Sequence, residues 1–187
     1  MKGFFSDRKG IAATEFALIM PLLVMLSLSI FELTFRVQAA DELDRYTFQL
    51  GDFLSRFAEL TDDDIDEFYD MSDRIMPGVE YEESSLSVII VSIGFEEDGD
   101  PVLLWTRSRG PDQLVYDIET ARGLAPPGQS IMLIRTKLST TTMFSVFGGT
   151  TLTLASDSVF KPRTTRAIAI DGDLTDVGEV IVGYENE

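Results

Sequence analysis

The pattern of hydrophobic and polar positions divides the chain into an apolar run near its start and a longer remainder in which the two kinds of residue alternate. Phe16 to Phe31 contains 16 residues without a charge. As a helix this run spans about 24 Å, and its extension to Phe35 reaches about 30 Å, the thickness of a bilayer's hydrocarbon core. The extension includes Glu32, whose carboxylate we expect near the far interface, within reach of the lipid headgroups. We predict one membrane span over residues 11–36.

The charges on either side of this span predict its orientation. Lys2, Arg8 and Lys9 stand against Asp7 before the span, whereas the residues after it are strongly acidic. Positive residues remain on the cytoplasmic side of a membrane helix. We therefore expect a basic leader at residues 1–10 in the cytoplasm and an exported domain at residues 37–187.

Two general interpretations of the first segment are a cleaved secretory signal and an uncleaved membrane anchor. A secretory signal has a shorter apolar stretch followed by small residues at the cleavage site, and Val37 to Ala40 is a poor substitute for such a site. An uncleaved anchor explains the topology but does not require Glu15. A carboxylate at that place is tolerable, because the positive end of a helix dipole favours it.

Pro21 lies inside the apolar run. Because proline has no N–H, the carbonyl of Ala17 loses its helical partner, and a kink or a locally loosened turn is expected. Prolines are also tolerated in membrane helices generally. Both a general tolerance and a role in extraction from the membrane remain open for this residue.

Helical periodicity continues beyond the span. Apolar residues recur at steps of three, four and one, which predicts an amphipathic stalk that Gly51 interrupts weakly. A second helix is expected after Thr61, an N-cap with Asp64 three residues on and with Leu60 and Ile65 placed as a hydrophobic staple. The stripe of the stalk comprises Val37, Ala40, Leu43, Tyr46, Leu50, Phe53, Leu54 and Phe57, and the second helix buries Ile65, Phe68, Tyr69 and Ile75 and ends at Pro77–Gly78.

Strand patterns dominate the rest of the chain. Leu86–Phe95 and Val102–Thr106 flank a turn and predict a hairpin. Further strands are expected at Ile131–Leu138, at Thr150–Phe160, which Lys161-Pro162-Arg163 ends, and once or twice after Ala167. A short helix is expected near Leu114–Ala121. The loop Ser139–Gly149 carries the apolar residues Met143, Phe144, Val146 and Phe147. One long helix followed by mostly antiparallel strands predicts an α+β fold.

Composition excludes several classes of function. The chain has 187 residues and a formal net charge of −17, which argues against nucleic acid and anionic lipid as partners. Histidine and cysteine are missing from the sequence, which removes the commonest general base, the cysteine nucleophile and most zinc sites. We expect neither an enzyme nor a cofactor. Asp62, Asp64 and Asp66 alternate as in a calcium loop, but Glu67 occupies the position where glycine is needed, so no metal site is predicted.

The N-terminal residues carry a resemblance to a known family. Gly10 followed by Ile11-Ala12-Ala13-Thr14-Glu15-Phe16 resembles the type III signal sequence of type IV pilin-like proteins. More narrowly, GIAATEFALIMPLL with the later IFELTFR resembles TadE-like (TadE/TadF) minor pilins, or pseudopilins, of the tight-adherence (Flp pilus) machinery. The resemblance is close over about residues 8–36.

The resemblance implies a type IV pilin-like fold, with the long helix packed on the sheet, and cleavage by a prepilin peptidase between Gly10 and Ile11. Glu15 would then be the fifth residue of the mature chain. Its implied role is assembly: it pairs with the terminal amine of a neighbouring subunit, and Phe16 is part of the same shared triplet.

The function implied in this way is that of a minor pilin in the bacterial inner membrane, with a periplasmic C-terminal domain and possible incorporation into the pilus. Its partners would be the prepilin peptidase, other pilins and the pilus assembly platform, with no nucleic acid. The alternative is an uncleaved, single-pass, membrane-anchored periplasmic binding module. A start of the mature chain at Ile11 favours the first function, and retention of the leader favours the second.

Overall fold

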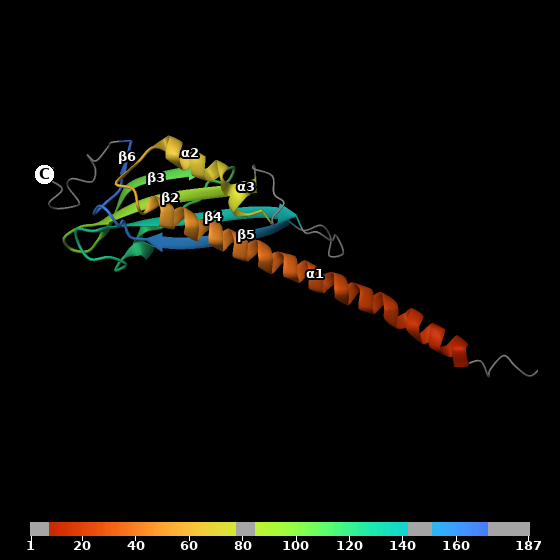
Figure 1. The fold of residues 1–187 in the computed structure, drawn as a ribbon. Helices are drawn as coiled ribbons and strands as arrows, with labels where there is room; N and C mark the ends of the chain where they lie inside the picture. Colours follow the sequence, from red (N-terminus) through yellow and green to blue (C-terminus); the bar gives the residue numbers. More distant parts are fainter. Residues whose placement is uncertain (1–7, 78–84, 142–150, 172–187) are drawn as a thin grey trace, which may run out of the picture.

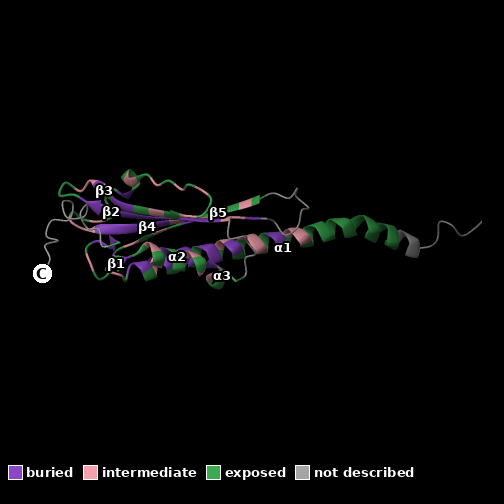
Figure 2. Cartoon of the chain, turned by 90° about the horizontal axis from the view of Figure 1, so that it is seen from above, coloured by how far each residue is buried: buried purple, intermediate pink, exposed green. Residues whose placement is uncertain are grey.

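A long N-terminal helix packs against an antiparallel sheet and extends far beyond it, as the computed structural model shows (Figure 1). The structure describes residues 8–77, 85–141 and 151–171. Helices α1, α2 and α3 cover one face of the sheet (Figure 2), and the connection between β3 and β4 packs on the other face through Leu114, Tyr116 and Ile118. The predicted α+β class is confirmed.

The apolar run and the amphipathic stalk form one continuous helix, α1 (Arg8–Leu54), which includes Pro21 without a break. The helix begins before Gly10, so this glycine does not interrupt it. The predicted stripe is correct at Leu43, Tyr46, Leu50 and Leu54, all of which are buried, but Val37 and Phe53 are exposed and Ala39 is buried instead of Ala40. Phe57 follows the end of the helix.

Gly51 lies within α1, which continues through it, and this residue also has a packing role. The ring of Phe160 lies directly against it, and a Cβ atom built on Gly51 would stand 2.0 Å from Phe160 Cε2. A side chain at this position would require the ring of Phe160 to move. One turn earlier, the Thr47 and Thr136 hydroxyls hydrogen-bond at 2.5 Å and add a polar contact to the buried interface.

The capping prediction for the second helix is confirmed, although the helix divides in two. In α2 (Asp62–Asp70), the Asp64 N–H donates to the Thr61 hydroxyl at 3.2 Å, and the Thr61 N–H donates to the Asp64 carboxylate at 2.9 Å. This capping box satisfies backbone donors at both residues. Met71 separates α2 from the single-turn α3 (Ser72–Ile75).

The main sheet has the strand order β3-β2-β4-β5, with every neighbouring pair antiparallel. Its strands are β2 (Leu86–Phe95), β3 (Pro101–Arg109), β4 (Ser130–Thr141) and β5 (Thr151–Phe160). Strand β2 is buried along its whole length, because side chains of α1 and α2 cover one of its faces and the β3–β4 connection covers the other. The predicted hairpin and the two later strands are confirmed, and the predicted short helix is a single 3-10 turn, η2 (Ile118–Ala121).

A second, two-stranded sheet joins the end of the α1 region to the late part of the chain. Strands β1 (Glu59–Leu60) and β6 (Ala169–Ile170) pair in parallel, which the sequence pattern did not predict for β1. The first residues of the predicted apolar loop extend β4, whereas Met143 to Phe147 and everything after Asp171 lie outside the described residues.

Candidate functional site

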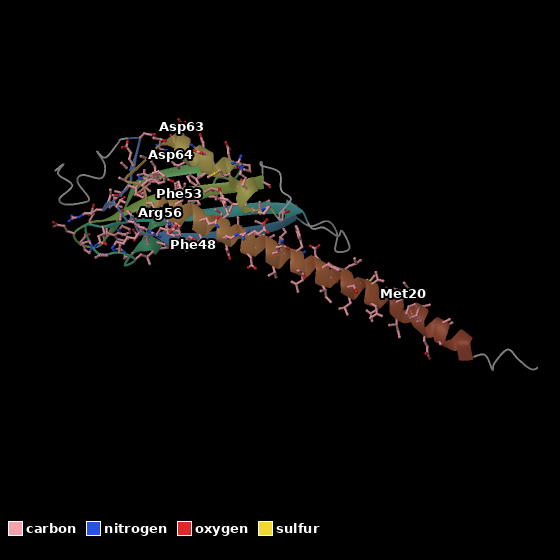
Figure 3. The ribbon with its side chains drawn as sticks, viewed as in Figure 1. Met20, Phe48, Phe53, Arg56, Asp63 and Asp64 are labelled. Carbon is pink, nitrogen blue, oxygen red and sulfur yellow. The ribbon has the colours of Figure 1, made fainter. Side chains whose placement is uncertain are left out.

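The first half of α1 exposes apolar side chains in every direction. We call residues 12–27 the exposed half, since each of these residues is exposed, and residues 39–54 the packed half, which lies on the sheet. The most apolar stretch of the helix has a mean hydropathy of 2.2, and 6% of this stretch is buried within the protein. Met20 projects from the ribbon far from the sheet (Figure 3). By length and composition this part of the helix can cross a membrane.

The hydroxyl groups near the end of the apolar run are satisfied within the helix. Ser27, Ser29 and Thr34 each donate to the carbonyl four residues earlier, at 2.9, 2.8 and 2.8 Å. In hydrocarbon an unsatisfied polar group costs several kcal/mol. These internal bonds therefore make the sequence compatible with a lipid environment in spite of its polar residues.

Glu15 is an exposed carboxylate among exposed apolar side chains. Among the side chains that the structure describes, none forms an ion pair or a hydrogen bond with it. Phe16 beside it is 60% exposed. Gly10 and Ile11 belong to the first turns of α1, and only their backbone is described. The candidate processing and assembly residues thus occupy one end of the helix, away from the folded domain (Figure 1).

Glu32 differs from the expectation that its carboxylate reaches the headgroups. It is only 4% exposed, and Arg36 Nε donates to its carboxylate at 3.2 Å. The expectation was wrong because burial by the folded protein begins here, at the first buried residue along α1. Glu32 therefore marks the boundary between the helix surface that faces outward and the surface that faces the domain.

The acidic residues at the start of α2 pair with arginines of β3. Arg107 Nε donates to Asp62 at 2.7 Å and Arg107 Nη2 to Asp171 at 3.3 Å, while Arg109 pairs with Asp66. The hydrogen bond from Arg107 lowers the pKa of the Asp62 carboxyl, and partial burial opposes this shift. The carboxylates of Asp62 and Asp66 fasten α2 to the sheet. No group of described residues has the composition of a metal site.

An open cleft of about 490 Å³ lies at the end of the sheet, where β2 and β5 finish and β4 begins. Lys161 and Arg166 give it positive charge, and Glu97 lies on its rim. Two other lining residues, Gln129 and Thr165, each bury a side-chain oxygen that has no hydrogen-bond partner among the described residues. The sequence patterns did not indicate this cleft, because its residues come from three separate turns.

Comparison with known proteins supports the resemblance at the N-terminus. A family model described as TadE-like protein matches residues 10–47. The match begins at Gly10, includes Glu15, Pro21 and Glu32, and ends at Thr47 inside the packed half. No curated protein and no solved structure matches the chain. The expected similarity to the TadE-like family is confirmed over this segment, and the sheet domain lies beyond it.

Proposed function

We propose that this chain is a minor pilin or pseudopilin of a tight-adherence (Flp-type) pilus machinery. The observation that carries the proposal is the coincidence of the family match with the exposed half of α1. The matched residues include a glycine, a glutamate five positions later and an apolar surface that the chain's own domain leaves uncovered. Such a surface needs lipid or other helices around it, as a membrane-anchored assembly subunit provides.

The proposed location is the bacterial inner membrane, with a single span, a cytoplasmic N-terminus and a periplasmic domain. The basic residues Lys2, Arg8 and Lys9 support this orientation, because positive loops remain in the cytoplasm. A highly acidic domain on the other side is compatible with the same direction of insertion. The membrane itself is thus one partner, and the prepilin peptidase, other pilins and the assembly platform are the proposed protein partners.

Maturation is proposed to occur between Gly10 and Ile11. Glycine lowers the stability of a helix by about 1 kcal/mol relative to alanine, which favours unwinding of the first turns of α1 into a protease site. Cleavage would release a positive α-amine at Ile11 and remove the basic leader. The amine would be the complement of the carboxylate at Glu15.

Glu15 is proposed to act in assembly by pairing with the terminal amine of a neighbouring subunit. A lone carboxylate in lipid is costly, and pairing with an opposite charge offsets part of this cost. Phe16 is proposed to pack at the same contact, and Pro21 to loosen the helix locally during extraction from the membrane.

Analysis of the mature N-terminus in the native host tests the processing step. We expect intact-mass measurement and N-terminal sequencing to find Ile11 first, and Gly10→Val to leave the leader attached. Gly3→Val is the matched control, a glycine of the same leader whose replacement should leave cleavage unchanged. Retention of residues 1–10 in the native protein would contradict the proposal.

Substitution of Glu15 tests the assembly step separately. We expect Glu15→Ala to be cleaved normally but to lower incorporation and pilus output, since the terminal amine of the neighbour loses its partner. Glu59→Ala, at an exposed carboxylate of the domain, is the control and should leave both unchanged. Normal pilus output from Glu15→Ala would exclude the proposed role of this carboxylate.

The alternative function, an uncleaved membrane-anchored binding module, is favoured by the cationic cleft around Lys161 and Arg166. A cleft lined by Lys161 and by two side-chain oxygens without a hydrogen-bond partner among the described residues has the chemistry to bind a small anionic ligand that also donates a hydrogen bond. Retention of the leader together with loss of ligand binding in Lys161→Gln would favour this function over the first.

A further inference from the structure

Strand β5 forms one edge of the main sheet. Its ten residues pair with β4 along their full length, from Met132↔Phe160 to Thr141↔Thr151. Among the described strands, none pairs with its other side, and Figure 1 shows no strand alongside it there. The outward backbone N–H and C=O groups of such an edge are a template for an additional strand.

The two edges of the sheet differ in how they discourage such pairing. The opposite edge, β3, carries Arg107 and Arg109, begins at Pro101, and has a register irregularity opposite Ser92 and Ile93. Charges, proline and irregularities are the usual devices that protect an edge. Strand β5 pairs in regular register, contains no proline, and has a single charged residue.

That single charge is neutralised inside the chain. Arg135 on β4 donates to both oxygens of Asp157, from Nε at 2.7 Å and from Nη2 at 2.8 Å. The hydrogen bond with Asp157 raises the pKa of Arg135 above its ordinary value, and partial burial opposes this shift. In a chain with a net charge of −17, the β5 edge is therefore an electrically neutral strip.

Apolar side chains stand on both faces beside this edge. Phe48 on α1, labelled in Figure 3, is 59% exposed. Its ring centre lies 5.3 Å from that of Phe160. On the opposite face of the sheet, Val159 is 47% exposed. A strand added to β5 would extend the sheet beneath α1, and could cover Phe48 with one side chain and Val159 with another.

We propose that β5 binds an extended segment of a different polypeptide, which adds to the sheet as a further strand. The segment should alternate apolar with small polar residues and should be neutral or basic. Asp41 and Asp44 are exposed one to two turns before Phe48 on the same face of α1, so acidic residues near the end of the segment would be repelled. Main-chain hydrogen bonds supply the affinity in this kind of recognition, and side chains supply the specificity.

A second copy of the same strand fits poorly, and this step rests on the membrane anchor of the proposed function. Antiparallel pairing of two β5 strands would point the two α1 helices in opposite directions, which excludes anchoring both in one membrane. Parallel pairing keeps the helices aligned but requires an offset between the copies, so the pair could not be a symmetric dimer. These geometric requirements favour a segment of another protein over a second copy as the occupant.

Amide hydrogen exchange on the full chain in detergent micelles tests the proposal without requiring cleavage or pilus assembly. The probe is a synthetic peptide of the length of β5 that alternates valine with threonine and has a lysine at each end. In the free chain we expect alternate β5 amides to exchange rapidly, and the peptide to slow them by at least about tenfold. The same peptide with proline at alternate positions should give no protection, since it lacks the donors.

Two substitutions show whether the peptide occupies the predicted place. Phe48→Ala should weaken the protection severalfold, whereas Val115→Ala, at a 78% exposed site on the β3–β4 connection, should not change it. Slow exchange of all β5 amides in the free chain, or no protection by the peptide, would overturn the proposal. Protection that rises with chain concentration in the absence of peptide would identify a second copy as the occupant and overturn the assignment to another protein.

Discussion

The exposed and packed halves of α1 share one backbone but differ in their surroundings. In the exposed half apolar residues lie all around the helix, whereas in the packed half most of them lie on the buried side. Leu43, Leu50 and Leu54 are buried there, and Phe48 and Phe53 are the exposed exceptions beside Asp41 and Asp44. A helix that is apolar all around requires an apolar environment, while a one-sided helix requires a protein face on that side. One continuous helix therefore presents a different kind of surface in each of its halves.

The largest expected effect comes from replacing one leucine in each half by alanine. Leu43 is 1% exposed and Leu23 is 50% exposed. We expect Leu43→Ala to lower the free energy of unfolding of the domain by about 2–5 kcal/mol, because it leaves a cavity in the core. Leu23→Ala should leave it unchanged. Denaturant unfolding in micelles, followed by the fluorescence of Trp105, measures both, and equal losses would refute the division into halves.

A smaller effect is expected when a methyl group is added to each half. Gly51→Ala brings its Cβ into the ring of Phe160 and should cost about 1–3 kcal/mol, as overpacking does. Gly10→Ala should not affect unfolding of the domain. The double variant Gly51→Ala/Phe160→Leu should recover part of the loss in the same denaturant experiment; no recovery would place the strain elsewhere.

The two glutamates of α1 sharpen the comparison further. Glu32→Gln weakens the charge-assisted bond to Arg36 and should lower the free energy of unfolding by about 1–2 kcal/mol. Glu15→Gln should leave the unfolding of the domain unchanged and lower pilus output. Thermal unfolding of both variants and a pilus assay in the native host distinguish a carboxylate that stabilises the fold from one that acts in assembly. Equal melting temperatures of the two variants would contradict this distinction.

The smallest expected effect concerns pH. A hydrogen bond from Arg56 and the nearby charge of Arg163 lower the pKa of Asp52, in the packed half, below its ordinary 3.8. A carboxyl group with a lowered folded pKa stabilises the fold above its unfolded value, and this contribution is lost as the pH falls through the folded pKa. Asp52→Asn should therefore flatten the decline of the melting temperature below about pH 4. Asp44→Asn, at an exposed carboxylate, is the control and should leave that decline unchanged.

Local signals in the sequence were sufficient to predict much of the fold. The capping box at Thr61 and Asp64 depends on residues three apart, and the β2–β3 hairpin on two adjacent strands and their turn, so each is recognisable in a short window. The membrane-compatible run and the family resemblance are also contained within the first part of the chain.

Contacts between distant residues could not be predicted in the same way. Glu59 pairs with Ala169, and Gly51 packs on Phe160. Neither the spacing nor the residue types of these pairs predict the contact. The burial of Glu32 likewise depends on where the folded domain begins along α1. The processing and assembly residues at Gly10, Ile11, Glu15, Phe16 and Pro21 remain predictions, since their chemistry involves partners.

The continuity of α1 has a mechanical consequence. The helix extends for 47 residues, about 70 Å, and its packed half runs beside the sheet, where Thr47 binds Thr136 and Asp52 binds Arg163. A force on the exposed end of the helix acts along its axis and loads these contacts in shear. The contacts therefore resist the force together and do not break one after another. A force along the helix axis would therefore be shared by the contacts of the whole packed half.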